Sequence, residues 1–269
     1  MAIITISRLT GSLGDEIARA VAEKLRYNYV DKMKISDALA DLGLAVPEFE
    51  KFDGKKPTIW QSLSNQKKKF TFFLRAAVYD FASSGNVVIL GRGGQALLKD
   101  IPGTLHVRIV APFETRMRRL MEMEGYDDKK TAQFIAQNDR DSSGYIRSFF
   151  DIDWNNEDLY DLVLNTRTMS MQTATALVIA AITAQEFKER PKQVEKSLAD
   201  VALAQITWGT LVGFAGIDLT SVEVAQGVVM LAGLASSPAR IEECQKIVSR
   251  LKGVKEVRSN LDIVALTSM

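Results

Sequence analysis

The chain starts with a short β-branched run, a glycine-containing turn and an amphipathic helical pattern, and this order restricts its fold more than any other feature. Residues 3–7 are typical of a buried strand, and Gly11 to Gly14 form the turn that follows. Ile17, Val21 and Leu25 then recur at helical spacing. Such a turn directs several backbone N–H groups to the positive end of a helix, where an anion is favoured. The segment predicts either a phosphate-binding loop or a plain tight turn.

The alternation of strands and helices continues along the chain. Residues 87–90 form a second buried-type strand that ends in Gly91-Arg92-Gly93-Gly94. A third strand at residues 105–110 is stopped by Pro112, and a fourth at residues 161–165 precedes a long helical pattern. This order predicts an α/β fold with a parallel sheet and flanking helices, whose ligand sits at the carboxyl ends of the strands.

The charged segment at residues 186–196 marks a domain boundary, because the pattern beyond it is different. An apolar helix, a hairpin with its turn at Gln226-Gly227, a second helix and a last strand at residues 254–264 follow. This αββαβ order is a complete small α+β unit. We therefore expect two domains, at residues 1–187 and 195–269.

Composition narrows the classes of function. A net charge of +1 argues against nucleic acid as a partner, and no apolar run approaches the length of a transmembrane segment. The amino terminus does not resemble a signal peptide, and Cys244 is the only cysteine, so a reducing, cytoplasmic setting is expected. His106, the only histidine, lies in an apolar run and is predicted to be a core or strand-edge residue. A histidine-rich zinc site is excluded.

Five segments together resemble the cytidylate-kinase-like family, a branch of the P-loop-type nucleoside monophosphate kinases. They are TISRLTGSLGDEIARAVAEKL, NYVDK, VVILGRGG, LHVRIVAPFETRMRRLMEMEG and YIRSFFDIDWNNEDLYDLVLNT, and the match covers almost all of residues 1–185. The resemblance implies a P-loop kinase-like sheet, ATP as substrate with Mg²⁺, and a nucleoside monophosphate such as CMP as phosphoryl acceptor. It does not say which residues would hold the metal.

The resemblance also implies roles for individual residues. Arg92, directly after a strand, would hold the acceptor phosphate through its planar guanidinium. Asp31 would position metal or nucleotide, or would only cap the helix that follows it. The loop that would bind the donor phosphates contributes Ser7, Arg8, Gly11, Ser12 and Gly14.

A mobile lid is the last implied element. Its arginines would close over the transferring phosphoryl group and offset its charge. Each of them is equally well explained as a solvated helix charge, and Arg118 is expected to lie on the surface. The lid candidates are Arg116, Arg119, Arg140 and Arg147.

Two departures from the family pattern bear on activity. Asp15 replaces an arginine, and a carboxylate there would repel a polyphosphate. Ser142 stands where an arginine is expected three residues before Tyr145, and Arg140 is the candidate that would substitute for it. The alternatives to a kinase are therefore a catalytically weak or inactive nucleotide-binding regulator, and an adaptor that acts through its C-terminal domain.

The C-terminal segment VEVAQGVVMLAGLASSPARIEECQKIVSRLKGVKEVRSNL resembles a BON domain. That resemblance implies binding of a phospholipid or another small ligand, and the alternative is a structural or dimerising role that would make the protein a homo-oligomer. Residues 67–69 are a lysine run next to phenylalanines; we interpret them as a solvated basic turn before an amphipathic helix rather than as a nucleic-acid contact.

Overall fold

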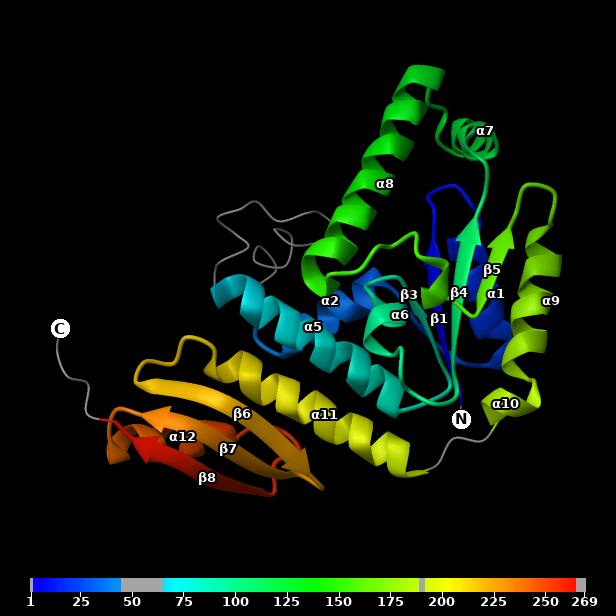
Figure 1. Ribbon diagram of the computed structural model, residues 1–269. Coiled ribbons are helices and arrows are strands. Elements are labelled where there is room, and N and C mark those ends of the chain that lie inside the picture. The colour runs from blue at the N-terminus through cyan, green and yellow to red at the C-terminus, as the bar shows by residue number, and fades with distance from the viewer. Residues whose placement is uncertain (1, 45–64, 189–191, 265–269) are drawn as a thin grey trace.

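The computed structural model describes residues 2–44, 65–188 and 192–264. Its larger part is built on a five-stranded parallel sheet with the order β2-β3-β1-β4-β5 (Figure 1). The α/β fold expected from the alternating pattern is confirmed. The strands are β1 (Ile3–Arg8), β2 (Asn28–Val30), β3 (Val87–Leu90), β4 (Thr104–Val110) and β5 (Leu162–Asn165).

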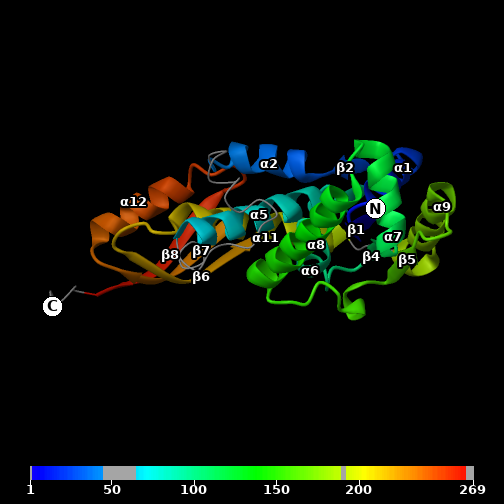
Figure 2. The ribbon, with the colours of Figure 1, turned by 90° about the horizontal axis from the view of Figure 1, so that it is seen from above.

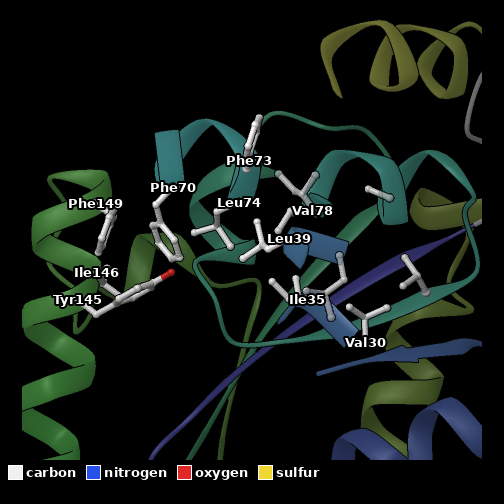
Figure 3. Packing of buried hydrophobic residues seen from close by; sticks show 14 of the residues in the cluster. Val30, Ile35, Leu39, Phe70, Phe73, Leu74, Val78, Tyr145, Ile146 and Phe149 are labelled. Atoms are coloured by element: carbon white, nitrogen blue, oxygen red, sulfur yellow. The ribbon is translucent and has the colours of Figure 1, made fainter. Parts of the chain in front are cut away.

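Helices cover both faces of this sheet. On one face, α1 (Gly14–Leu25) and α9 (Met171–Ile182) bury Ile17 and Val178 against the strands. On the other face, Phe70, Leu74 and Ile146 belong to a second core cluster (Figure 3). The helices of this second face are α2 (Lys32–Asp41), α5 (Asn65–Ser83), α6 (Gly94–Leu97) and α8 (Asp128–Phe150), while α7 (Phe113–Glu124) packs against α8.

The smaller part contains a three-stranded sheet with the order β6-β7-β8, in which β6 and β7 are antiparallel and β7 and β8 are parallel. Gln226 and Gly227 both have positive φ, as a two-residue hairpin turn requires. Pro238 is the first residue of α12, as expected of a proline that opens a helix. The elements are α11 (Lys192–Leu211), β6 (Ile217–Ala225), β7 (Val228–Ala235), α12 (Pro238–Val248) and β8 (Glu256–Ile263).

One local prediction is wrong. Residues 67–69 lie inside α5 rather than in a turn, and the ammonium of Lys67 donates to the carbonyl and hydroxyl oxygens of Ser148 on α8. The charged segment at residues 186–196 overlaps α10 (Gln185–Lys188) and the start of α11, and the domain boundary expected there stays a prediction. Among the described residues, no helix is both long and apolar enough to cross a membrane.

Helix α11 lies along α5, so the two parts of the chain share an apolar contact (Figures 1 and 2). Leu198 of α11 is buried within the core cluster that contains Phe73 of α5. Gly209 lets the helices approach closely, because a Cβ atom there would lie 2.3 Å from Cε1 of Phe73. The interface therefore depends on the absence of a side chain at one position of α11.

Replacing Gly209 by alanine is expected to destabilise the protein by about 2 kcal/mol, because the buried Phe73 ring must move. At an ordinary position inside a helix, the same replacement raises the free energy of unfolding by about 0.5–1 kcal/mol. Urea unfolding of the full chain measures the change. The double variant with Phe73→Leu should lose less than the sum of the two single variants; additive losses would show that the two positions are not in contact.

His106 lies in the core of the sheet, as predicted. It is 7% exposed, and its Nδ1 is 2.7 Å from the hydroxyl of Thr5 on the neighbouring strand. Burial lowers the pKa of the imidazole below its ordinary value of 6.5, against a smaller opposing effect of Asp161. The folded protein therefore prefers the neutral ring.

This shift predicts a pH dependence of stability. Between the lowered folded pKa and the unfolded value near 6.5, the unfolded chain binds more protons, so stability falls as the pH is lowered through this range. Urea unfolding at pH 7.5 and at pH 5.5 should show a larger loss for the wild type than for His106→Asn. An equal loss in both proteins would mean that the imidazole does not contribute.

Candidate functional site

A pocket of about 430 Å³ opens where the carboxyl ends of β1 and β3 meet helix α8. We call it the central pocket. Its position agrees with the rule that parallel α/β sheets bind ligands at the carboxyl ends of their strands. It is lined by Ser7, Arg8, Asp15, Arg19, Tyr29, Asp31, Lys32, Leu90, Gly91, Arg92, Gly93, Gln95, Asn138, Asp141, Ser142, Tyr145, Ile146 and Trp154.

Four of the residues that the sequence indicated as site residues line this pocket. Asp31 caps α2, since its Oδ1 accepts hydrogen bonds from the backbone amides of Met33 and Lys34 at 3.0 and 3.2 Å. The capping alternative for this residue is thus confirmed, and the residue also lines the pocket. Arg92 adopts a left-handed backbone conformation with φ 55°, and its guanidinium lies 5.8 Å from the centre of the Tyr145 ring. The four are Ser7, Arg8, Asp31 and Arg92.

Asp15 is paired inside the protein. Nε and Nη2 of Arg8 each donate to its carboxylate at 3.1 Å, in the two-pronged geometry that guanidinium and carboxylate favour. Both side chains are partly exposed at the edge of the pocket. A phosphate that enters must therefore compete with Asp15 for Arg8.

The glycine turn lies beside the central pocket without lining it. The amide of Ser12 donates to the carbonyl of Leu9 at 3.1 Å, and its buried hydroxyl donates to Ile109. Gly14 is needed for close packing, since a Cβ there would lie 2.3 Å from Cβ of Arg8. The loop is thus tied to β4 and to Arg8. Its members Gly11, Ser12 and Gly14 are absent from the lining of the pocket.

Two arginines of α7 hold this loop from the other side. Nη1 and Nη2 of Arg116 donate to the carboxylate of Asp139 on α8 at 3.1 and 2.9 Å, and Nη1 also reaches the carbonyl of Thr10 at 3.4 Å. Arg119 donates to the carbonyls of Gly11 and Thr166 at 3.3 and 2.7 Å. In this conformation both arginines contact protein atoms around the loop and do not line the central pocket.

The other two lid candidates lie on the exposed side of α8. Nη2 of Arg140 donates to Oε1 of Gln137 at 2.9 Å, and this side chain lines a separate open groove with Phe113 and Phe134. Arg147 is exposed near the end of α8. Neither lines the central pocket, so their predicted role in catalysis requires α8 to move.

A buried hydrogen-bond network beside the pocket was not predicted from the sequence. Nε1 of Trp154 donates to the hydroxyl of Ser7 at 2.7 Å. The buried guanidinium of Arg108 donates to the backbone carbonyl of Trp154, to the hydroxyl of Tyr160 at 3.2 Å and to Oδ1 of Asn155 at 2.8 Å. Its only sequence signal was a basic residue inside an apolar strand.

Gln95 is a further side chain that the sequence did not indicate. It is 2% exposed and lines the pocket, and its Nε2 has no acceptor within the described part of the chain. A buried amide without a partner is costly, so this donor is suited to a polar ligand atom.

The carboxylates of the pocket are the groups that could help to hold the Mg²⁺ ion of a bound nucleotide. Asp15, Asp31 and Asp141 line it, yet no group of three or more potential ligands is close enough to hold a metal ion within residues 2–44, 65–188 and 192–264. Mg²⁺ is commonly held by one or two carboxylates together with substrate phosphates and water. The residues present fit a metal that arrives with its nucleotide.

The sheet order, the glycine turn before α1 and the pocket at the strand ends are those of a P-loop kinase-like α/β domain. The model of the cytidylate kinase-like family matches residues 3–168, and the chain belongs to this family. Residues 197–265 match the model of the BON domain.

Proteins of known sequence and structure agree with this assignment. The cytidylate kinase of Pyrococcus horikoshii is 27% identical over 181 residues, which cover 67% of this chain and 88% of that protein. The cytidylate kinase of Methanococcus aeolicus is 24% identical over 183 residues, covering 67% and 97%. A crystal structure of an uncharacterized protein from Eubacterium ventriosum superposes with a TM-score of 0.53 at 22% identity, over 69% of this chain and all of that one, which supports the fold alone.

Proposed function

We propose that this chain transfers the terminal phosphoryl group of ATP to a nucleoside monophosphate, with CMP as the first candidate. The observation that carries the proposal is the pocket at the carboxyl ends of the strands, which gathers Arg92, Gln95 and Asp31 beside the glycine turn. The similarity to cytidylate kinases at 24–27% identity supports the reaction class and leaves the acceptor base to experiment.

The acceptor would bind on the Arg92 side of the pocket. Arg92 offers a planar pair of donors that matches two phosphate oxygens. Gln95 supplies a buried amide donor, and the ring of Tyr145 provides an apolar wall beside Arg92. A phosphate together with a polar ring fits this combination of charge, amide and aromatic surface.

The donor would bind at the turn that precedes α1. Amides of Gly11 and Gly14 at the helix amino terminus, with Ser7 and Arg8 at the strand end, would bind its phosphates, and the Ser12 amide would join them by giving up its bond to the carbonyl of Leu9. Mg²⁺ would offset their charge, with Asp31 or Asp141 as candidate carboxylates of the pocket. Catalysis would then come from positioning and charge neutralisation, completed when Arg116, Arg119, Arg140 and Arg147 approach with α7 and α8.

A turnover assay tests the proposal. The full chain is mixed with ATP, Mg²⁺ and one of CMP, UMP, dCMP, AMP or GMP, and ADP is measured. We expect ADP formation that depends on a pyrimidine monophosphate and exceeds the rate without acceptor. Absence of nucleotide binding to the pocket would overturn the proposal.

A catalytically weak or inactive nucleotide-binding regulator is the second candidate. The Arg8–Asp15 pair favours it, because it neutralises a cation that a phosphate would otherwise use. Binding of ATP without ADP formation, whichever monophosphate is supplied as acceptor, would support this function. An adaptor that acts through residues 197–265 would show neither ATP binding nor turnover. Its affinity for its own ligand would not change when Arg92 is replaced.

Replacing Asp15 by asparagine is expected to tighten the binding of Mg²⁺-ATP about fivefold, since a unit charge about 4 Å away contributes about 1 kcal/mol in a high dielectric. The variant removes a repelling charge and releases Arg8. Titration calorimetry measures the change, and Asp37→Asn on the exposed side of α2 is the matched control. Weaker binding in the variant would show that Asp15 holds Arg8 in its working position.

A further inference from the structure

A second pocket, of about 530 Å³, lies where the two parts of the chain meet. We call it the junction pocket. It is formed by the first half of α5, the end of α11 and the start of β6, and shares no residue with the central pocket. Its lining residues are Asn65, Lys67, Lys68, Thr71, Phe72, Arg75, Trp208, Leu211, Val212, Gly213, Ile217, Asp218 and Leu219.

One side of the junction pocket is flat and apolar. The rings of Phe72 on α5 and Trp208 on α11 are nearly parallel, with centres 5.6 Å apart and planes 8° apart. Leu211, Ile217 and Leu219 extend this surface toward β6. The two rings stack on each other, so the pair offers a ligand its outer faces and edges, and a planar ring packs well against such a surface with an aliphatic border.

The charges of the pocket are mainly positive. Lys67, Lys68 and Arg75 line the pocket together with a single carboxylate, that of Asp218. Lys67 is bonded to Ser148, whereas Nε of Arg75 is a buried donor without an acceptor among the residues that the structure describes. A buried donor of this kind costs free energy until an acceptor arrives, and an anionic oxygen is the acceptor that guanidinium favours.

We propose that the junction pocket binds a small soluble organic anion with a flat ring, packed against the Phe72–Trp208 pair and held by Arg75 and Lys68. The volume lies within the range of pockets that enclose small molecules, and such pockets often form where domains meet. Neither the phosphoryl-transfer reaction nor the nucleotide pocket requires this site, so the proposal is independent of the proposed function.

The test uses 1-naphthalenesulfonate as probe, with titration calorimetry on the full chain. We expect one site per chain, with affinity at least about tenfold higher than for sulfate or for 1-naphthol, because only the whole probe satisfies both halves of the pocket. Arg75→Gln and Lys68→Glu should each weaken binding about tenfold. Lys246→Glu on the exposed side of α12 is the control and should bind like the wild type.

Three outcomes would overturn the proposal. Equal affinity for the probe and 1-naphthol would mean that the cations take no part. Loss of binding in Arg92→Ala with retention in Lys68→Glu would place the probe in the central pocket. Sedimentation with anionic phospholipid vesicles that is abolished by Lys68→Glu, without binding of the soluble probe, would assign the cations to a membrane surface. Because Lys68 is exposed, its variant is expected to fold even if Arg75→Gln does not.

Discussion

Replacement of Arg92 by alanine is expected to lower kcat/KM for the monophosphate acceptor by about 10²- to 10³-fold, the loss seen when one donor to a reacting group is removed. Arg92 lines the central pocket directly after β3, where its guanidinium can take two phosphate oxygens at once. The effect should fall mainly on the acceptor, so the KM for ATP is expected to change little. Steady-state assays with each substrate varied in turn measure this split.

Arg92→Lys gives the conservative comparison. It keeps the charge but loses the planar fork, so its activity should lie between the wild type and the alanine variant. Arg118→Ala on the exposed side of α7 is the matched control for the loss of one positive charge. An unchanged acceptor KM and kcat in Arg92→Ala would remove this residue from the site.

The largest expected loss of stability follows from Arg108. Its buried guanidinium donates to Trp154, Asn155 and Tyr160 and lies over both aromatic rings. Alanine leaves these acceptors unpaired and removes a packed side chain, so the free energy of unfolding should fall by about 3 kcal/mol. Arg118→Ala, at an exposed position of the following helix, should change it by less than about 0.5 kcal/mol.

Two further observations separate packing from hydrogen bonding in this network. Arg108→Met keeps most of the apolar stem and should recover part of the loss. Since Trp154 donates to Ser7 at the wall of the central pocket, Arg108→Ala should also shift the tryptophan emission of the folded protein. A variant as stable as the wild type would show that the guanidinium adds nothing to the fold.

The main architecture was predictable because its signals are local. Apolar runs bounded by glycine and proline placed β3 and the hairpin turn at Gln226, and Pro112 directly precedes α7. The rule for parallel sheets predicted a ligand at the carboxyl ends of the strands. The choice of Arg8 and Arg92 came from the family resemblance, and both residues line the central pocket.

The partners of the site residues were not predictable from spacing. Helical periodicity placed Arg116 and Arg119 on one face of α7, but only the tertiary structure brings them to Asp139 and Thr166. Arg108 and Trp154 are far apart along the chain, and a strand pattern gives no sign that a buried arginine will meet an indole. The sequence also suggested that Asp15 would repel phosphate; its pairing with Arg8 is a contact that no motif encodes.

The close packing of α11 on α5 limits how this protein could have been assembled. A C-terminal domain joined by a loose linker can be exchanged between proteins by recombination without changes elsewhere. Here, the α11 of a transplanted domain would need a small residue opposite Phe73 and an apolar residue at the position of Leu198. The α5 of the host protein would need side chains that fit both. The two domains are therefore expected to have diverged as a pair, with compensating substitutions across this helix contact.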